Sequence, residues 1–317
     1  MTLNSNDQPL ITVAMICYNQ ENYIAQTIES IISQNYPLLQ LVIADDASKD
    51  GTVAILRKYE KKYPEIIQII AHKKNLGINA NIDSLFQYIK GRYVCLLGGD
   101  DYFLPDKLLK QVAFMEQNPD IIMSYHDVQV CDSQGNVLYN YNNPYYGNRP
   151  YSGDIARLLV EKRCFIPALS TMVRTNMASD IRYRIDLPPC ADWMYFIELA
   201  AKSKVGYLDE QLGCYRRHSG NITNRVDISW EEIIFQKIRE FYPDFDDSVN
   251  KGLAILYLDY VFKYALVKKW HDSASTLKKL SCQIIKYPLL IGSVLNHFID
   301  MTVRRLALLT KTKKFLR

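Results

Sequence analysis

The sequence lacks paired cysteines. Its seven cysteines are scattered singly along 317 residues, and no Cys-x-x-Cys pair occurs. An odd, dispersed set of this kind argues against a disulfide framework and against a structural zinc site, both of which need cysteines at regular spacing. We therefore expect reduced thiols and a cytoplasmic location.

Long apolar runs are also missing. Residues 4–7 are polar, so no signal peptide is expected. The most apolar stretch near the C-terminus, Tyr287 to Ile299, is too short to span a bilayer and is interrupted by Pro288 and Asn296. Residues 302–317 carry six Lys or Arg and no acid. We therefore expect at most a peripheral contact with the inner face of a membrane, through this basic C-terminus.

No glycine-rich loop follows the first predicted strand, residues 10–16. The chain therefore lacks both the Gly-x-Gly-x-x-Gly fingerprint of dinucleotide-dependent dehydrogenases and the basic, glycine-rich loop of sugar-phosphate nucleotidyltransferases. The net charge of +4 is small, and we expect no nucleic-acid partner. An apolar content of 48% allows a sizeable core.

What the sequence does contain, up to Asp127, is a regular alternation of apolar strands and amphipathic helices. The predicted strands are residues 10–16, 39–44, 66–71, 93–97 and 121–125. This order predicts an α/β fold with a mainly parallel sheet flanked by helices. Polar clusters that follow such strands share one edge of the sheet, where open α/β sheets bind their ligands.

The pattern changes after Asp127. Short strands are predicted at 168–173, 205–208 and 213–217, and a tyrosine-rich stretch at 139–151 either stacks on sugar rings or forms a plain surface loop. Helical patterns follow at 229–242, 247–270, 272–286 and 289–310. We therefore expect one domain over 1–226, in two halves divided at 127, and an all-helical C-terminal region over 227–317.

The sharpest local signal is Gly99-Asp100-Asp101, at the end of the fourth predicted strand. Two adjacent carboxylates there form a hard-oxygen site suited to Mg²⁺ or Mn²⁺ and a phosphorylated ligand. Taken alone, the same residues are equally consistent with an acidic loop that caps the following helix.

Six motifs occur in one order between residues 10 and 222. They are Ile-Cys-Tyr-Asn at 16–19, Asp-Asp-Ala-Ser-Lys-Asp-Gly-Thr at 45–52, Asn-Leu-Gly at 75–77, Gly-Asp-Asp at 99–101, Asp192 at a helix start, and Arg-Arg-His-Ser-Gly-Asn at 216–221. In this combination the sequence resembles the inverting nucleotide-sugar glycosyltransferases of family 2, whose fold is called GT-A. The resemblance implies a Rossmann-like nucleotide-binding half (1–127) and an acceptor-binding half (128–226).

The resemblance also implies how the donor, by family habit a UDP-sugar, is held. Tyr18 and the main chain near Ile16 would frame the base, and Asp46 would accept a hydrogen bond from a pyrimidine N–H, although Asp45 and Asp46 also suit a turn. For Asn75 and Asn81 a turn or cap is as plausible as a place in the pocket. The residues expected to bind the nucleotide are Ile16, Tyr18, Asn19, Asp46, Asn75, Asn81, Asp100 and Arg217.

A divalent metal, Mn²⁺ or Mg²⁺, is implied at Asp101, with His218 as a further ligand. Arg216 or Arg217 would clamp the diphosphate, because guanidinium pairs well with phosphate oxygens. Asp192 would be the base that takes the proton of the acceptor hydroxyl. The alternative role for Asp192 is to cap the helix that begins there.

The implied reaction moves one sugar to a glycan, expected to be a lipid-linked oligosaccharide in the synthesis of a bacterial surface polysaccharide such as O-antigen or capsule. Gly98 departs from the family pattern, because many relatives carry a third acid there. It keeps a second hypothesis open, a non-catalytic relative that binds nucleotide-sugar or glycan.

Overall fold

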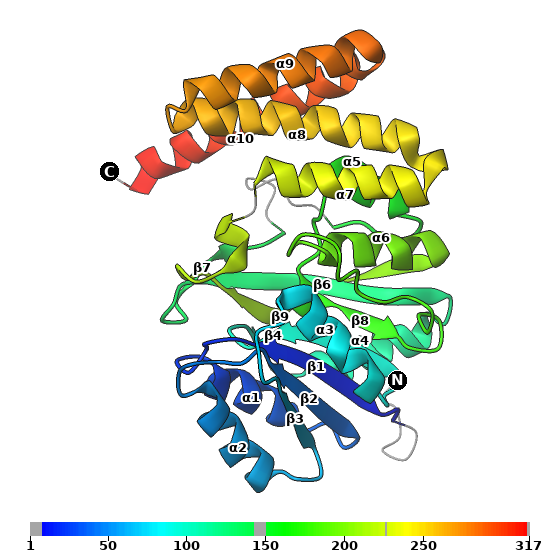
Figure 1. The fold of residues 1–317 in the computed structure, drawn as a ribbon, viewed down its shortest axis with the longest axis vertical. Helices are drawn as coiled ribbons and strands as arrows, with labels where there is room; N and C mark the ends of the chain where they lie inside the picture. Colours follow the sequence, from blue (N-terminus) through cyan, green and yellow to red (C-terminus); the bar gives the residue numbers. More distant parts are fainter. Residues whose placement is uncertain (1–7, 143–149, 226, 316–317) are drawn as a thin grey trace. The chain divides into compact units, whose positions relative to one another are not determined.

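The computed structural model describes residues 8–142, 150–225 and 227–315, and the side chains up to residue 302. Within these residues the chain divides into two compact units (Figure 1). The first runs to Tyr141 and adds residues 150–155 and 166–224. The second combines residues 156–165 with the chain after Asn224, so the helical unit takes one segment from inside the first 226 residues.

A nine-stranded sheet organises the described part of the first unit, in the order β3-β2-β1-β4-β8-β6-β9-β5, with β7 paired to β6. Its strands are β1 Ile11–Cys17, β2 Leu39–Asp45, β3 Ile67–Ala71, β4 Tyr93–Gly98, β5 Tyr102–Phe103, β6 Ile121–Cys131, β7 Val137–Asn140, β8 Met172–Arg174 and β9 Lys204–Arg216. Strands β1 to β4 are parallel, and β8 runs antiparallel to its neighbours β4 and β6. The predicted mainly parallel α/β sheet is confirmed.

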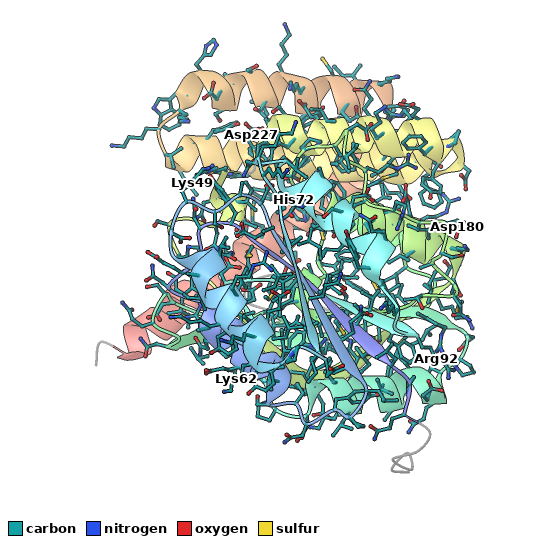
Figure 2. The ribbon with its side chains drawn as sticks, turned by 60° about the horizontal axis from the view of Figure 1, so that its bottom comes forward. Lys49, Lys62, His72, Arg92, Asp180 and Asp227 are labelled. Atoms are coloured by element: carbon teal, nitrogen blue, oxygen red, sulfur yellow. The ribbon has the colours of Figure 1, made fainter. Side chains whose placement is uncertain are left out.

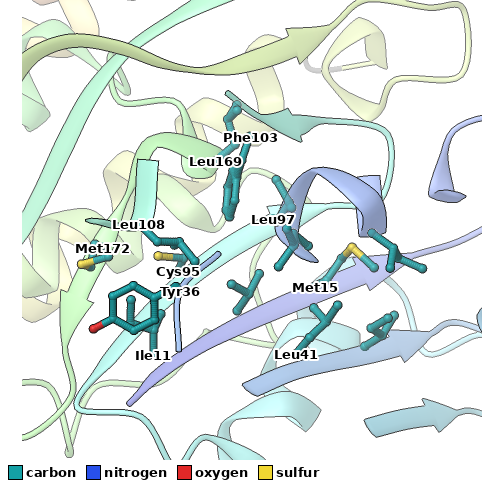
Figure 3. Packing of buried hydrophobic residues seen from close by; sticks show 14 of the residues in the cluster. Ile11, Met15, Tyr36, Leu41, Cys95, Leu97, Phe103, Leu108, Leu169 and Met172 are labelled. Carbon is teal, nitrogen blue, oxygen red and sulfur yellow. The ribbon is translucent and has the colours of Figure 1, made fainter. Parts of the chain in front are cut away.

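The central strands are buried on both faces, as their continuous apolar sequences predict. Met15 of β1, Leu41 of β2 and Cys95 of β4 are fully buried and belong to one hydrophobic core (Figure 3). Helices α1 Ile24–Ile32, α2 Thr52–Lys62, α3 Ile78–Leu85, α4 Lys107–Gln117 and α6 Asp192–Lys202 complete this unit. Strands β1, β2 and β4 end at Cys17, Asp45 and Gly98, where the sequence motifs begin.

The second unit is helical, as predicted. It contains α5 Ala156–Lys162, α7 Ile228–Phe241, α8 Asp246–Leu266, α9 Trp270–Lys286 and α10 Leu290–Phe315. Asp227, labelled in Figure 2, caps α7 by accepting a hydrogen bond from Ser229 N at 2.9 Å. No helix in the described ranges is long and apolar enough to cross a membrane.

Two expectations depend partly on residues that the structure does not describe. Tyr145 and Tyr146 of the tyrosine-rich stretch lie outside the described ranges, and so do the basic side chains after Thr302 on which the expected membrane contact depends.

One prediction about the second half was wrong. The pattern predicts separate strands at 205–208 and 213–217, whereas the structure has the single strand β9. The register between β6 and β9 shifts near Asp127, where His126 pairs with Leu208 but Asp127 pairs with Gln211. The polar residues between the two predicted strands form a bulge, and a bulge has the same polar signature as a turn.

Lys107 is a lysine in the core of the first unit, and its replacement tests what a buried cation costs in stability. It is fully buried, its Nζ lies 4.0 Å from the ring centroid of Phe103, and Nζ has no conventional hydrogen-bond partner among the described residues. Burial lowers the pKa of Lys107. We expect Lys107→Met to raise the free energy of unfolding by about 1–3 kcal/mol at pH 7, because a desolvated charge is removed.

Urea unfolding would measure this change. A lysine whose pKa is depressed by folding destabilises the native state below its ordinary pKa, so the gain should shrink as the pH approaches 10. Lys110→Met is the matched control on the same helix, because Lys110 is exposed and pairs with Glu210. An equal effect at both positions would contradict the explanation.

Candidate functional site

The turn from Gly98 to Asp101 lies at the carboxyl ends of β1 and β4. Gly99 N donates to Ile16 O at 2.9 Å, and the Thr27 hydroxyl of α1 lies 2.7 Å from Asp101 O. Arg216 N, at the end of β9, donates to Asp101 Oδ1 at 2.8 Å. Helix α4 begins only at Lys107, with Asp106 as its N-cap, so the two aspartates do not cap it.

Asp100 is joined to the loop that follows β9. The Asp100 Oδ2 atom lies 2.9 Å from His218 Nε2 and 3.2 Å from Asn221 Nδ2. Because His218 Nδ1 accepts the N–H of Gly220 at 3.2 Å, we infer that Nε2 carries the imidazole proton and donates it to Asp100. To bind a metal through Nε2, His218 must give up this hydrogen bond.

Asp101 is only 7% exposed. Burial, together with the neighbouring Asp100, raises the pKa of Asp101 well above its usual range. A Cβ atom placed on Gly98 would lie 2.8 Å from Asp100 Oδ1 and 3.9 Å from Asp101 Oδ2. Both carboxylates therefore border the space that a side chain at Gly98 would occupy.

These donors fit a cation that takes further ligands from phosphates. Two carboxylates and the His218 ring are donors that Mn²⁺ and Mg²⁺ accept, and Mg²⁺ in particular binds proteins through few side chains. In the described part of the chain, no three His, Cys, Asp or Glu side chains are arranged as a complete metal site. Binding of a metal at this place would therefore depend on the phosphate groups of a bound ligand.

The two arginines that the sequence left open have different surroundings. Arg216 is 2% exposed, and its guanidinium donates to Asp100 O at 2.8 Å and to Gln26 Oε1 at 2.6 Å. It also lies 4.9 Å from the centroid of the Tyr23 ring. Arg217 is exposed and lies over the Tyr215 ring. Arg216 is thus a structural anchor of the Asp100–Asp101 turn, and Arg217 is accessible to a phosphate.

The end of β1 is joined to the loop after β2. Asn19 has a left-handed backbone (φ 53°), and its Oδ1 accepts the N–H of Lys49 at 2.7 Å. Tyr18, next to it, is 45% exposed. Asp45 accepts the N–H of Ser48 at 2.9 Å, which is the turn-forming role that its sequence also suggested. Tyr18 is therefore the side chain here that is free to stack on a base.

Asp46 holds the Asn75-Leu76-Gly77 loop. Its carboxylate accepts the N–H of Leu76 at 2.6 Å and that of Gly77 at 3.0 Å, and Asn75 Nδ2 donates to Asp46 O at 3.1 Å. Asn81 is 2% exposed and donates to Ala44 O at 3.2 Å, while its Oδ1 has no partner among the described residues. Asp46 and Asn75 thus form one hydrogen-bonded unit beside β2.

Asp192 is the first residue of α6 and is partly exposed. Its N-cap is Ala191, and Asp192 Oδ1 accepts the N–H of Trp193 at 2.9 Å. Although part of the side chain reaches solvent, the surrounding chain desolvates the carboxyl, which raises the pKa of Asp192 to about 6. It is not part of the hydrogen-bonded group around Asp100. Its segment is held instead by Asn79 of α3, whose Nδ2 donates to Leu187 O at 2.7 Å.

Asn221 and Tyr23 also contact the group of residues around Asp100, although neither was predicted to have a role. Asn221 also donates to Arg216 O at 3.1 Å, and the Tyr23 ring packs 4.8 Å from the His218 ring. Asn221 could have been noticed as the last residue of the Arg-Arg-His-Ser-Gly-Asn motif. Tyr23 carries no local signal, because its contacts come from residues almost 200 positions away.

Comparisons with known proteins agree with this architecture. The family described as "Glycosyl transferase family 2" matches residues 12–181. The uncharacterized protein Rv1520 of Mycobacterium tuberculosis is 31% identical over 218 residues, which are 67% of this chain and 60% of Rv1520. The chain thus spans about three fifths of the length of this relative.

Two solved structures share the fold. S. aureus TarS (1-349), in complex with UDP-GlcNAc, has a TM-score of 0.65 at 15% identity, covering 95% of this chain and 92% of that one. Mannosyltransferase PcManGT from Pyrobaculum calidifontis, in complex with GDP-Man and Mn²⁺, has a TM-score of 0.60 at 16% identity, covering 96% and 88%. With the family match over more than half of its length, the chain belongs to glycosyltransferase family 2.

Proposed function

We propose that the protein is an inverting glycosyltransferase that moves one sugar from a nucleotide-diphosphate donor to a glycan. By family habit the proposed donor is a UDP-sugar. The observation that carries the proposal is the Asp100–Asp101 turn at the ends of β1 and β4, hydrogen-bonded to Arg216 and His218. Family membership and the nucleotide-sugars bound by TarS and PcManGT support it. The proposed acceptor is a lipid-linked oligosaccharide of a bacterial surface polysaccharide.

The nucleotide would lie along the ends of β1 and β2. Tyr18 offers an exposed ring for the base. Asp46 uses one lone pair on each oxygen for the loop at Leu76 and Gly77, and carboxylate oxygens have a second lone pair that can accept a base N–H. Arg217 is the accessible cation for the diphosphate.

Asp101 and His218 would hold a divalent cation, Mn²⁺ or Mg²⁺, beside the diphosphate. When bound, such a cation supplies positive charge that stabilises the nucleoside diphosphate as it leaves. The Mn²⁺ present with GDP-Man in PcManGT supports this use. Asp100 would face the ribose, held by Asn221 once His218 has exchanged its hydrogen bond to Asp100 for the cation.

In the transfer step, the oxygen of an acceptor hydroxyl attacks the anomeric carbon from the face opposite the diphosphate. The Asp192 carboxylate takes the hydroxyl proton, the new C–O bond forms, and the bond to the diphosphate oxygen breaks with both electrons leaving on that oxygen. A pKa of about 6 leaves Asp192 ionised at neutral pH and more basic than an ordinary aspartate.

A thermal-shift panel of UDP- and GDP-sugars, with and without Mn²⁺, tests the proposal. A ligand at 100 times its Kd stabilises the native state by about 2.7 kcal/mol, so we expect the right donor with Mn²⁺ to raise Tm by about 3–6 °C. Release of nucleoside diphosphate without acceptor would identify an enzyme. Binding without release or transfer would favour the non-catalytic alternative that Gly98 suggested, and no shift with any donor would overturn both.

A further inference from the structure

Helix α10 has two apolar faces. Leu290 and Val294 are 6% and 9% exposed and belong to a core cluster of the helical unit with Leu258 of α8 and Leu280 of α9. A second set on the same helix is largely exposed, although the Phe298 ring also lies 5.7 Å from the Phe262 ring of α8. Its members, with their exposed fractions, are Ile291 (48%), Leu295 (54%), Phe298 (40%) and Ile299 (57%).

These four side chains lie at i, i+4, i+7 and i+8, so they form one continuous face of an α-helix. Leu289, in the turn before α10, is also exposed (97%) but does not belong to the helix. We call Ile291, Leu295, Phe298 and Ile299 the apolar face of α10. A single exposed apolar residue needs no explanation, but a helical stripe of four indicates an interaction surface.

The charge along the same helix indicates what this surface contacts. The apolar face is followed by residues 302–317, which carry six Lys or Arg and no acid. We propose that the apolar face of α10 docks on the surface of an anionic lipid bilayer, with the helix lying in the plane of the interface. This arrangement buries the apolar side chains among acyl chains, and the positive charge of the sequence that follows is complementary to the lipid phosphates.

A second copy of the chain is a poorer occupant. A stable protein interface buries about 800 Å² per partner, more than the four partly exposed side chains of this face provide. A second copy would also bring the same positive charge and no acid from this segment, whereas anionic lipid brings the complementary charge. The proposal does not depend on the proposed transfer reaction.

Vesicle co-sedimentation of the full chain tests the proposal. Vesicles of phosphatidylcholine with about one third phosphatidylglycerol are compared with pure phosphatidylcholine. We expect binding to the anionic vesicles that weakens with salt, and a partition coefficient lower by about tenfold or more in the Leu295→Ser, Ile299→Ser variant.

The double variant Val137→Ser, Leu138→Ser is the matched control. These residues of β7 are 53% and 55% exposed, close to the exposed fractions of Leu295 and Ile299, so a similar amount of exposed apolar side chain is removed elsewhere. Vesicle binding should stay within about twofold of the wild type in this control, and release of nucleoside diphosphate from a soluble donor should be unchanged in both variants.

Three results with vesicles would overturn the proposal: no binding of the wild type to anionic vesicles, equal loss of binding in both variants, or binding by the α10 variant that equals that of the wild type. Analytical ultracentrifugation without vesicles completes the test. A wild-type dimer that the α10 variant loses would show that the face joins two copies, which also overturns the proposal.

Discussion

Asp192→Asn is expected to lower kcat by about 10²–10⁴-fold, with the Kd of the nucleotide-sugar retained. The reason is that Asn has nearly the same shape but cannot accept the proton of the attacking hydroxyl. It can still accept the N–H of Trp193 through its amide oxygen, so the start of α6 is preserved. Steady-state kinetics and calorimetric titration with the donor would separate the two quantities.

The pH dependence of the wild type gives an independent check. Because burial raises the pKa of Asp192 to about 6, kcat should be constant at neutral pH and fall tenfold per pH unit well below pH 6, as the base becomes protonated. The residual activity of Asp192→Asn should not show this limb. A wild-type profile without an ionisation near pH 6 would argue for another base.

The same substitution should stabilise the protein. A carboxyl whose pKa is raised by folding, here from 3.8 to about 6, destabilises the native state above pH 6 and leaves stability unaffected below pH 4. Each tenfold change in an equilibrium constant is about 1.4 kcal/mol, so Asp192→Asn gains at most roughly 3 kcal/mol at pH 7. The gain should shrink as the pH falls below 6 and vanish well below pH 4, where the Asp192 carboxyl is neutral in both the folded and the unfolded state.

Asp180→Asn provides the control for both effects. Asp180 lies at the surface, labelled in Figure 2, and pairs with Lys202 at the end of the same helix α6. Its replacement should leave kcat within about twofold and lower stability slightly or not at all. Near-wild-type turnover by Asp192→Asn would remove Asp192 as the base, whatever its effect on stability.

Local sequence was enough to predict the strands that bear the site. The runs at β1, β2 and β4 are apolar on both faces, and such runs between polar loops leave few alternatives in a chain of this length. The extent of strand β9 was harder to predict, because Asp209 and Glu210 interrupt its apolar pattern. Only the pairing with β6 shows that the strand continues.

The candidate site divides in the same way. Asp100 and Asp101 could be predicted because they follow directly after a strand. The burial of Arg216 as the anchor of these two aspartates could not be predicted. Its partners Asp101 and Gln26 are 115 and 190 positions away in the sequence. The exposure of the apolar face of α10 could not be predicted either. Periodicity shows that a helix has an apolar stripe but not whether another element covers it.

Asp101→Asn should abolish the Mn²⁺-dependent part of donor binding and lower kcat/KM by about 10²–10³-fold. The substitution removes the carboxylate that is assigned to the cation. A bound cation stabilises the leaving diphosphate by several kcal/mol, and this stabilisation should be lost with it. The fold should persist, because an asparagine Oδ1 can still accept the N–H of Arg216. Burial and Asp100 raise the pKa of Asp101, so the unliganded variant should be no less stable than the wild type.

The measurement is the Tm shift produced by the donor at increasing Mn²⁺ concentrations, together with kcat/KM. Asp106→Asn is the control on the same loop, because Asp106 is exposed and its left-handed backbone (φ 64°) is one that Asn adopts readily. The control should keep the Mn²⁺-dependent shift and the activity. If Asp101→Asn kept the shift and Asp100→Asn lost it, the cation would belong to Asp100 and the assignment to Asp101 would be wrong.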